Sequence, residues 1–210
     1  MCNRIGAVMP KSWNLENAQK LADEFIYTFY KPSKEVISLL NVGDKAKLII
    51  GFESDDSEDP SAERMWVEIT ERIDNKFIGY LDNDPAYIKD LKYKDIIEFS
   101  EIHIVDTDLD DPIPAISEKY IKRCFVKNNI LDEGEAIGYL YREEPDAEDD
   151  SGWRFTTGSE TDEYMNNSEN SSYVSLGVVL REDDSVVHLL EHTSGIAFAK
   201  DQNGNFVKLN

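Results

Sequence analysis

The chain has little cysteine and no long hydrophobic run. Only Cys2 and Cys124 occur among its 210 residues, which argues against a disulfide framework and favours a reducing cytoplasm. Cys124 lies in a strand-like stretch with no His suggested nearby, so we interpret it as a small buried hydrophobe rather than a nucleophile. No apolar run reaches the roughly 18 residues of a membrane span, and the apolar patch near the N-terminus is too short for a secretory signal.

Basic residues are also scarce. The chain has 22 Lys and Arg against 43 Asp and Glu, a net charge of −21. This balance argues against a nucleic-acid partner, because such binding begins with neutralising phosphates, and it disfavours an anionic membrane surface for the same reason. A basic protein, in contrast, would be attracted and steered in quickly. A chain of this length, with 40% hydrophobic residues, can hold one large or two small packed domains.

The first half of the chain predicts helices followed by short strands. Apolar residues recur at helical spacing from Asn14 to Tyr30, and Pro32 would end that helix. A second short helix, capped by Ser33, would run through Leu40. Alternating patterns bounded by turn signals then predict a small twisted sheet or barrel. Its expected strands are residues 46–52, 65–73, 77–81 and 96–105.

Within residues 42–105, the stretch MWVEITERIDNKFIGYLDNDPAYIKDLKYKDIIEFSEIHI resembles the small β-rich domain of unknown function 2314. The shared features are a strand with Trp, a strand with Gly, an Asn-Asp-Pro turn and a Leu-Lys-x-Gly-Asp corner. In this chain the corner is Leu91 to Asp95, and Lys94 stands where the family has Gly. A positive φ there would be costly for Lys. The resemblance implies no catalytic residues.

The segment from Asp106 to Ser117, DTDLDDPIPAIS, is the expected domain boundary. It is rich in Asp and Pro, and strand patterning stops there. Its alternate aspartates have the spacing that begins a calcium loop, but Asp111 stands at the glycine position and Ser117 at the glutamate position, so we interpret it as an acidic linker. The sequence therefore predicts a two-domain α+β protein, with domains at residues 1–111 and 118–210.

The most distinctive stretch of the second half is residues 137–158, IGYLYREEPDAEDDSGWRFTTG. It predicts two strands joined by an acidic turn, because Pro145 stops ladder pairing and Ser151-Gly152 is a turn signal. A strand is expected before it and a hairpin near the C-terminus. These remaining elements are a strand at 122–130, an apolar stretch at 172–180 that fits strand or helix, a helix at 185–192, and a hairpin of 195–199 with 206–209.

The acidic hairpin supplies the candidate partner-binding residues. They are Arg142, Glu143, Glu144, Asp146, Asp149, Asp150, Trp153 and Arg154. A fixed Trp, forked Arg donors and carboxylate acceptors are typical of a recognition surface. The alternative is a solvated hairpin whose arginines screen its acids and whose Trp153 packs in the core. In that case alanine substitutions would lower stability rather than affinity.

The run REEPDAEDDSGWRFTTGSETDEYMNN, with the closing GIAFAKDQNGNF, resembles the bacterial immunity protein 33 family, also called domain of unknown function 2185. The resemblance covers about Tyr120 to Asn210. It implies a bacterial binding protein of the toxin–antitoxin kind, which neutralises a polymorphic toxin by protein–protein contact. We therefore expect a cytoplasmic, non-enzymatic protein with a basic protein toxin as its partner. The alternative is a regulatory or peptide-binding module without a toxin partner.

One motif suggests an enzyme instead. Residues 188–192 spell H-x-x-E-H, and on a helix His188 and His192 would share a face and could hold zinc, with Glu191 as base. Such a site needs a third ligand from a further helix downstream, and only residues 193–210 follow, which read as a hairpin. A metal-dependent hydrolase is therefore the least favoured function. We expect no catalytic residues and no cofactor, with the two histidines at most adventitious metal ligands.

Overall fold

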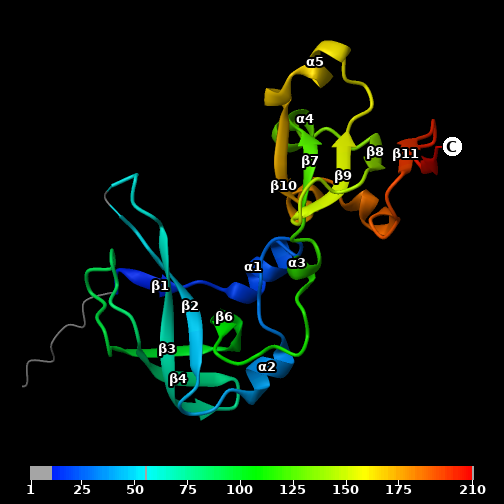
Figure 1. The fold of residues 1–210 in the computed structure, drawn as a ribbon. Coiled ribbons are helices and arrows are strands. Elements are labelled where there is room, and N and C mark those ends of the chain that lie inside the picture. Colours follow the sequence, from blue (N-terminus) through cyan, green and yellow to red (C-terminus); the bar gives the residue numbers. More distant parts are fainter. Residues whose placement is uncertain (1–10, 55, 210) are drawn as a thin grey trace, which may run out of the picture. The chain divides into compact units, whose positions relative to one another are not determined.

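The computed structural model describes residues 11–54 and 56–209, which form two compact units (Figure 1). The first unit contains the described residues up to Glu24 together with Tyr30–Ala115, and the second contains Phe25–Phe29 and the chain from Ile116 onward. Each unit has its own sheet and its own hydrophobic core. The mixture of helices and strands confirms the α+β class. Cys2 lies outside the described residues.

The first unit is mostly β-structure. Its elements are β1 (Trp13–Leu15), α1 (Ala18–Glu24), α2 (Lys34–Leu39), β2 (Lys45–Phe52), β3 (Ala62–Ile73), β4 (Lys76–Leu81), β5 (Ile96–Ser100), the 3₁₀ helix η1 (Glu101–His103) and β6 (Ile104–Thr107). The expected second helix is confirmed, because the Ser33 hydroxyl accepts a hydrogen bond of 3.1 Å from the Val36 N–H and begins α2. The strand expected at 96–105 is interrupted by η1, which turns the chain between β5 and β6.

The helix expected from Asn14 to Tyr30 is wrong at both ends. Its first residues lie in β1, which pairs antiparallel with Ile50–Phe52 of β2. Only α1 is helical, and the chain turns after it, so that Phe25–Phe29 packs in the second unit. Helical spacing of apolar residues predicted burial but not these tertiary pairings, which override local propensity.

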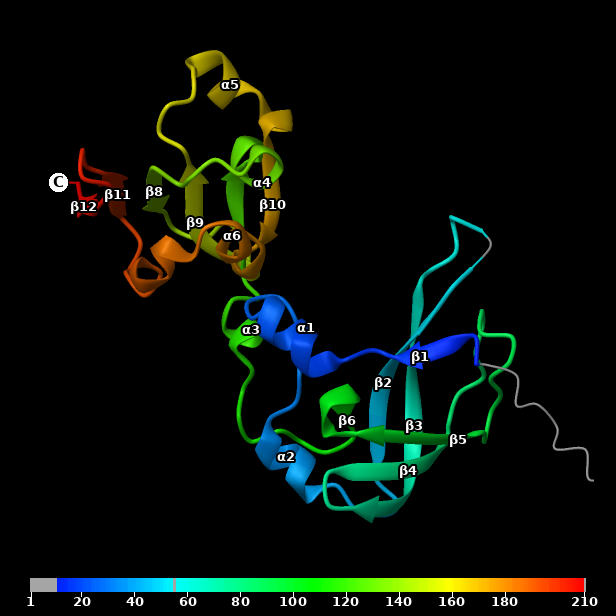
Figure 2. The ribbon, with the colours of Figure 1, turned by 180° about the vertical axis from the view of Figure 1, so that it is seen from behind.

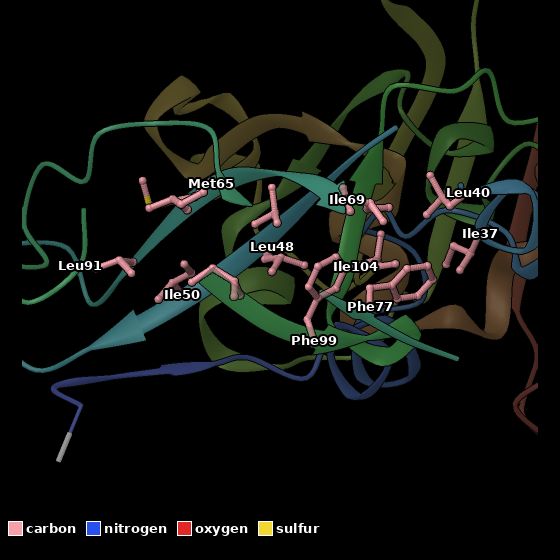
Figure 3. Close-up of a cluster of buried hydrophobic side chains, with 14 of the residues drawn as sticks. Ile37, Leu40, Leu48, Ile50, Met65, Ile69, Phe77, Leu91, Phe99 and Ile104 are labelled. Carbon is pink, nitrogen blue, oxygen red and sulfur yellow. The ribbon is translucent and has the colours of Figure 1, made fainter. Parts of the chain in front are cut away.

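The sheet of the first unit curls into a nearly closed barrel. Strands β1 to β5 lie in chain order, all antiparallel, and β6 returns to pair with Ala46–Leu48 of β2. Strand β3 pairs along one edge of β2. Strands β1 and β6 both pair along the opposite edge of β2, β1 with Ile50–Phe52 and β6 with Ala46–Leu48. The interior holds a continuous cluster of aliphatic and aromatic side chains (Figure 3), which includes Ile50, Phe77 and Ile104.

The corner at Lys94 keeps a left-handed backbone although it has no glycine. Its φ is 66°, a conformation that costs a residue with a Cβ about 1 to 2 kcal/mol. The Lys94 ammonium lies 3.1 Å from a Glu68 carboxylate oxygen and 3.2 Å from an Asp82 carboxylate oxygen. These ion pairs offset part of the strain, so the departure from the family pattern leaves the corner intact.

The second unit contains helices and strands interspersed along the chain. Its elements are α3 (Ile116–Lys119), β7 (Arg123–Lys127), α4 (Asn128–Glu133), β8 (Tyr139–Arg142), β9 (Asp150–Thr156), α5 (Asp162–Asn166), η2 (Ser168–Asn170), β10 (Ser171–Ser175), α6 (Leu176–Glu182), η3 (Asp184–Leu189), β11 (Ile196–Lys200) and β12 (Phe206–Lys208). The strand expected at 122–130 ends at Lys127 and continues as α4, and the ambiguous stretch at 172–180 divides into β10 and α6. No helix in the described part of the chain is long and apolar enough to cross a membrane.

The six strands of the second unit lie in the order β10-β7-β9-β8-β11-β12. Strands β7 and β9 are parallel and the other neighbours are antiparallel. One face of this sheet, which we call the inner face, packs against α4, α6 and η3, and Figure 2 shows α6 in front of it. Buried side chains of this face include Val126, Leu140 and Phe155. The opposite face, which we call the outer face, is therefore the one on which polar and aromatic residues of these strands lie.

Candidate functional site

An aromatic row crosses the outer face of this sheet. Tyr173 of β10 pairs with Phe125 of β7, Phe125 with Arg154 of β9, and Arg154 with Tyr141 of β8. Because side chains alternate between faces along a strand, these four residues lie opposite the buried ones of the inner face. The Phe125 and Tyr173 rings are 4.8 Å apart, and Phe125 is 41% exposed. This face therefore offers aromatic surface to a partner.

Arg154 is the centre of that row, and each of its three nitrogens donates at least one hydrogen bond. Its Nη1 and Nη2 donate to the two carboxylate oxygens of Asp150, at 2.9 and 2.8 Å, and its Nε donates to Glu143 at 2.6 Å. Nη1 also donates to the Trp153 carbonyl at 3.0 Å, and an Asp146 oxygen lies 3.6 Å from Nη2. The guanidinium lies 4.9 Å from the Phe125 ring centroid. Arg154 is only 6% exposed, so it organises the face rather than reaching out from it.

Asp150 folds the acidic loop around this ion pair. Its carboxylate accepts hydrogen bonds from the N–H groups of Gly152, at 2.9 Å, and Asp146, at 3.1 Å. The hydrogen bonds from Arg154, together with these two, hold the pKa of the Asp150 carboxyl well below its usual range although burial acts in the opposite direction. The same pairing with Asp150 raises the pKa of Arg154. Asp150 is therefore an ionised, fully bonded structural carboxylate.

The eight predicted site residues do not form one surface. Trp153 is 1% exposed and lies on the inner face, where its indole Nε1–H donates to the Leu190 carbonyl at 3.3 Å. It is therefore a core residue. Arg142 donates through Nε to the Ser151 carbonyl at 2.9 Å, and through Nη1 to the His192 carbonyl, so it ties the hairpin to the following loop. Trp153 therefore offers no surface to a partner, whereas Arg142 is half-buried with two internal hydrogen bonds.

The carboxylates divide into two groups. Glu143, Asp146 and Asp150 converge on Arg154, as described above. Glu144 lies elsewhere, accepting a hydrogen bond from the Ser194 hydroxyl, and Asp149 accepts one of 3.1 Å from the Tyr173 hydroxyl. Asp150 is buried with Arg154, whereas the other four acidic residues are exposed. The exposed part of the predicted site is thus Glu143, Glu144, Asp146 and Asp149.

The sequence interpretation missed the aromatic members of the face. Phe125, Tyr141 and Tyr173 stand beside Arg154 and Asp149 in space but on three different strands. Their alternation with buried neighbours, as in Arg123-Cys124-Phe125, is a signal for an outward-facing side chain. These aromatic side chains lie together only because of the order of the strands in the sheet, which cannot be deduced from the sequence pattern.

Two shallow hollows open on the outer face. The first, of about 320 Å³, is lined by residues that include Phe125, Lys127, Tyr141, Glu143, Asp146 and Arg154. The second, of about 420 Å³, is lined in part by Gly158, Glu160 and Lys200, and shares Thr156 and Met165 with the first. Carboxylate oxygens and aromatic rings line the first hollow together, which suits recognition of a cation.

The histidine motif has a geometry unlike that of a zinc protease. Residues 184–189 form the 3₁₀ helix η3, begun by Asp183, instead of the α-helix expected at 185–192. The helical spacing that would place His188 and His192 on one face is therefore absent. Glu191 pairs with Lys119 at 2.7 Å. Among the described residues, no group of three or more His, Cys, Asp or Glu side chains is placed to hold a metal ion.

Cys124 is buried, as expected. Its thiol donates to the Val174 carbonyl at 3.5 Å, and burial raises its pKa. A thiol held protonated in this way is a poor nucleophile, which agrees with its interpretation as a packing residue.

Comparison with known families supports both resemblances. Residues 124–210 match the family described as Immunity protein Imm33 domain, and residues 10–109 match the family described as Uncharacterized protein conserved in bacteria (DUF2314). The second match extends beyond residues 42–105 to include β1 and both helices of the first unit. No curated protein and no solved structure matches the chain. The part of the chain from residue 124 onward is therefore similar to an immunity-protein domain, and the part before residue 110 is similar to an uncharacterised bacterial family.

Proposed function

We propose that this chain is a cytoplasmic, non-enzymatic immunity protein that neutralises a basic protein toxin by direct contact through the outer face of its second unit. The observation that carries the proposal is the set of exposed carboxylates, Glu143, Asp146 and Asp149, around an aromatic row on the sheet face opposite α4 and α6. The match to an immunity-protein domain over the same strands supports it.

Electrostatics would drive the encounter. The net charge of −21 gives the chain a long-range attraction for a basic partner, which raises the association rate at low ionic strength. The aromatic rings would then supply the desolvated contact area that fixes the complex. Because the Debye length shortens from about 10 Å at 0.1 M salt to about 3 Å at 1 M, association through exposed carboxylates should weaken in salt.

A capture experiment with a functional readout tests this proposal. The tagged full chain is used to capture proteins from the source organism at low salt, with a parallel high-salt wash. Any captured protein is then expressed alone and together with the chain. We expect a basic protein that arrests growth alone, loses that effect when co-expressed, and leaves the resin at high salt. A captured protein whose toxicity is unchanged by co-expression would contradict neutralisation.

Matched charge variants locate the contact. The double variant Asp146→Asn with Asp149→Asn removes two carboxylates from the outer face. Its control, Asp132→Asn with Glu133→Gln, removes two exposed carboxylates from α4, which packs against the inner face. Both variants have the same net charge. We expect the first to weaken toxin capture and the control to leave it nearly unchanged. Equal capture by the two variants would remove the outer face from the proposal.

A further inference from the structure

We infer that the hollow of about 320 Å³ on the outer face is a socket for one arginine or lysine side chain of the protein partner. This inference rests on the proposed function and names the chemistry by which the partner is anchored. The hollow is lined by Phe125 of β7, Arg154 of β9 and Tyr141 of β8, which are paired residues on three neighbouring strands. Two carboxylates, those of Glu143 and Asp146, stand at its wall.

The charge of the socket favours a cation. Three carboxylates surround Arg154. It donates two hydrogen bonds to Asp150 and one to Glu143, and an Asp146 oxygen lies 3.6 Å from its Nη2. The guanidinium has one positive charge, and the Asp150 and Glu143 carboxylates that accept its hydrogen bonds more than balance it. Asp146 is 84% exposed and its contact with Arg154 is long, so its oxygens are free to accept hydrogen bonds from a partner.

The second cation of the hollow is also occupied. Lys127 is 8% exposed, and its ammonium donates to the Met165 carbonyl at 3.1 Å and to the Ser171 hydroxyl at 2.9 Å. The charged residues that line the hollow are two cations, Lys127 and Arg154, and two carboxylates, Glu143 and Asp146. Asp150 lies outside the lining and neutralises Arg154 through two hydrogen bonds. The exposed part of this charge is negative, since both cations are buried and Asp146 is not.

Aromatic walls give the socket its selectivity for a cationic side chain. Arg154 itself already lies over the Phe125 ring, 4.9 Å from its centroid, so this ring accepts a guanidinium at its face. Phe125 is 41% exposed, so a second cation can approach it from solvent. The volume is near the lower end of the roughly 300 to 1,000 Å³ of ligand pockets, which fits a single side chain better than a larger molecule.

The probe for this socket is N-acetyl-arginine-N-methylamide, compared with its neutral isostere, the corresponding citrulline derivative. Both are titrated into the ¹⁵N-labelled full chain while backbone amide shifts are followed. We expect the arginine probe to shift the amides of Phe125, Tyr141 and Thr156, and the citrulline probe to shift them little. Asp146→Asn should weaken the arginine response by about two- to fivefold, the range of one exposed ionic or cation–π contact. Asp132→Asn serves as the control of equal charge.

Two results of the titration would overturn the socket. One is an equal response to the arginine and citrulline probes. The other is a response to arginine that Asp146→Asn and Phe125→Leu both leave unchanged. The toxin experiment separates this inference from the proposed function. If the toxin is neutralised equally by wild type and by both variants, the socket is wrong and the function stands. If arginine binds in the hollow but the captured protein is not neutralised, the socket stands and the function is wrong.

Discussion

At the scale of single residues, the main distinction is between charges that fold the hairpin and charges that face solvent. Asp150 and Arg154 are ionised, buried and fully bonded to one another and to nearby backbone. A buried ion pair adds little net stability compared with an apolar pair, but removing one partner leaves the other charge uncompensated. These two residues were predicted to bind a partner, and the structure gives them an internal role that accounts for their place in the motif.

Asp150→Asn should therefore lower the free energy of unfolding of the second unit by about 3 kcal/mol at neutral pH, because Arg154 loses its bidentate partner. The neighbouring Asp149→Asn is the control. Asp149 is exposed and bonded to the Tyr173 hydroxyl, so its loss should cost about 0.5 kcal/mol or less. Urea unfolding of both variants measures the difference. Equal stability of the two variants would contradict the structural role of Asp150.

The stability advantage of wild type over Asp150→Asn should also depend on pH. The pKa of Asp150 is lowered in the folded state, so its contribution is present above the unfolded pKa of about 3.9 and is lost as pH falls towards the folded value. We expect the difference between wild type and variant to be constant from about pH 7 to pH 5 and to narrow below about pH 4. Urea titrations at several pH values check this. A difference that grows on acidification would contradict the assigned direction.

Residue chemistry predicted some of these roles and not others. The sequence left open whether Trp153 faces the core, because a strand residue can face either side and the alternation Trp153-Arg154-Phe155 fits both registers. The structure decides it, since Phe155 and Trp153 share the inner face and Arg154 takes the other. Phe125 could not be placed in the site from its own neighbours, because its contact with Arg154 requires the parallel pairing of β7 with β9.

At the scale of elements, the β8–β9 hairpin depends on the backbone of Gly152. Gly152 has a φ of 79°, and a Cβ added there would overlap the Glu143 carbonyl oxygen. The backbones of Glu143 and Gly152 approach closely because the Glu143 N–H donates a hydrogen bond of 3.0 Å to the Gly152 carbonyl. Only glycine meets both requirements, the left-handed conformation and the missing Cβ.

Gly152→Ala should therefore destabilise the second unit by about 3 kcal/mol, combining left-handed strain with a backbone clash. Gly204→Ala is a matched control, because Gly204 has a φ of 82° but open space where the Cβ would lie. It should cost about 1 kcal/mol from backbone conformation alone. Thermal or urea unfolding gives both values. If the two substitutions cost the same, the close approach of Glu143 has no energetic consequence.

Elements with a local cause were predicted best. The α2 cap at Ser33 and the closing hairpin of β11 and β12 follow from capping and turn chemistry within a few residues. In place of the helix expected at 185–192, the structure has the 3₁₀ helix η3, which is capped by Asp183. The Asp183 carboxylate accepts a hydrogen bond of 3.1 Å from the Ser185 N–H. The same carboxylate accepts from the Ile137 N–H at 3.0 Å, a long-range bond that no local pattern contains.

At the scale of the whole molecule, the two family matches lie on either side of the boundary expected at residues 106–117. The β-rich part comes first along the chain, and the part similar to an immunity protein follows it. The compact units add one feature that chain order does not predict. Phe25–Phe29, near the N-terminus, belongs to the second unit. Its Tyr27 ring meets Tyr120 edge to face at 5.6 Å, and its hydroxyl donates to Asp184 at 3.1 Å.

This arrangement makes the stability of the second unit depend on a residue far outside its family match. Tyr27→Ala should lower it by about 2 kcal/mol, through lost packing and a lost hydrogen bond, whereas Tyr27→Phe should cost about 1 kcal/mol or less because the ring remains. Ile26→Ala is the control in the same segment, since Ile26 is exposed. Hydrogen exchange of the full chain locates the effect: amides of β7 and β9 should exchange faster in Tyr27→Ala, and those of β2 and β3 should not. Faster exchange confined to β2 and β3 would instead assign the segment to the first unit. Its packing would then agree with the helical periodicity of residues 14–30 and not with the observed contacts of Tyr27.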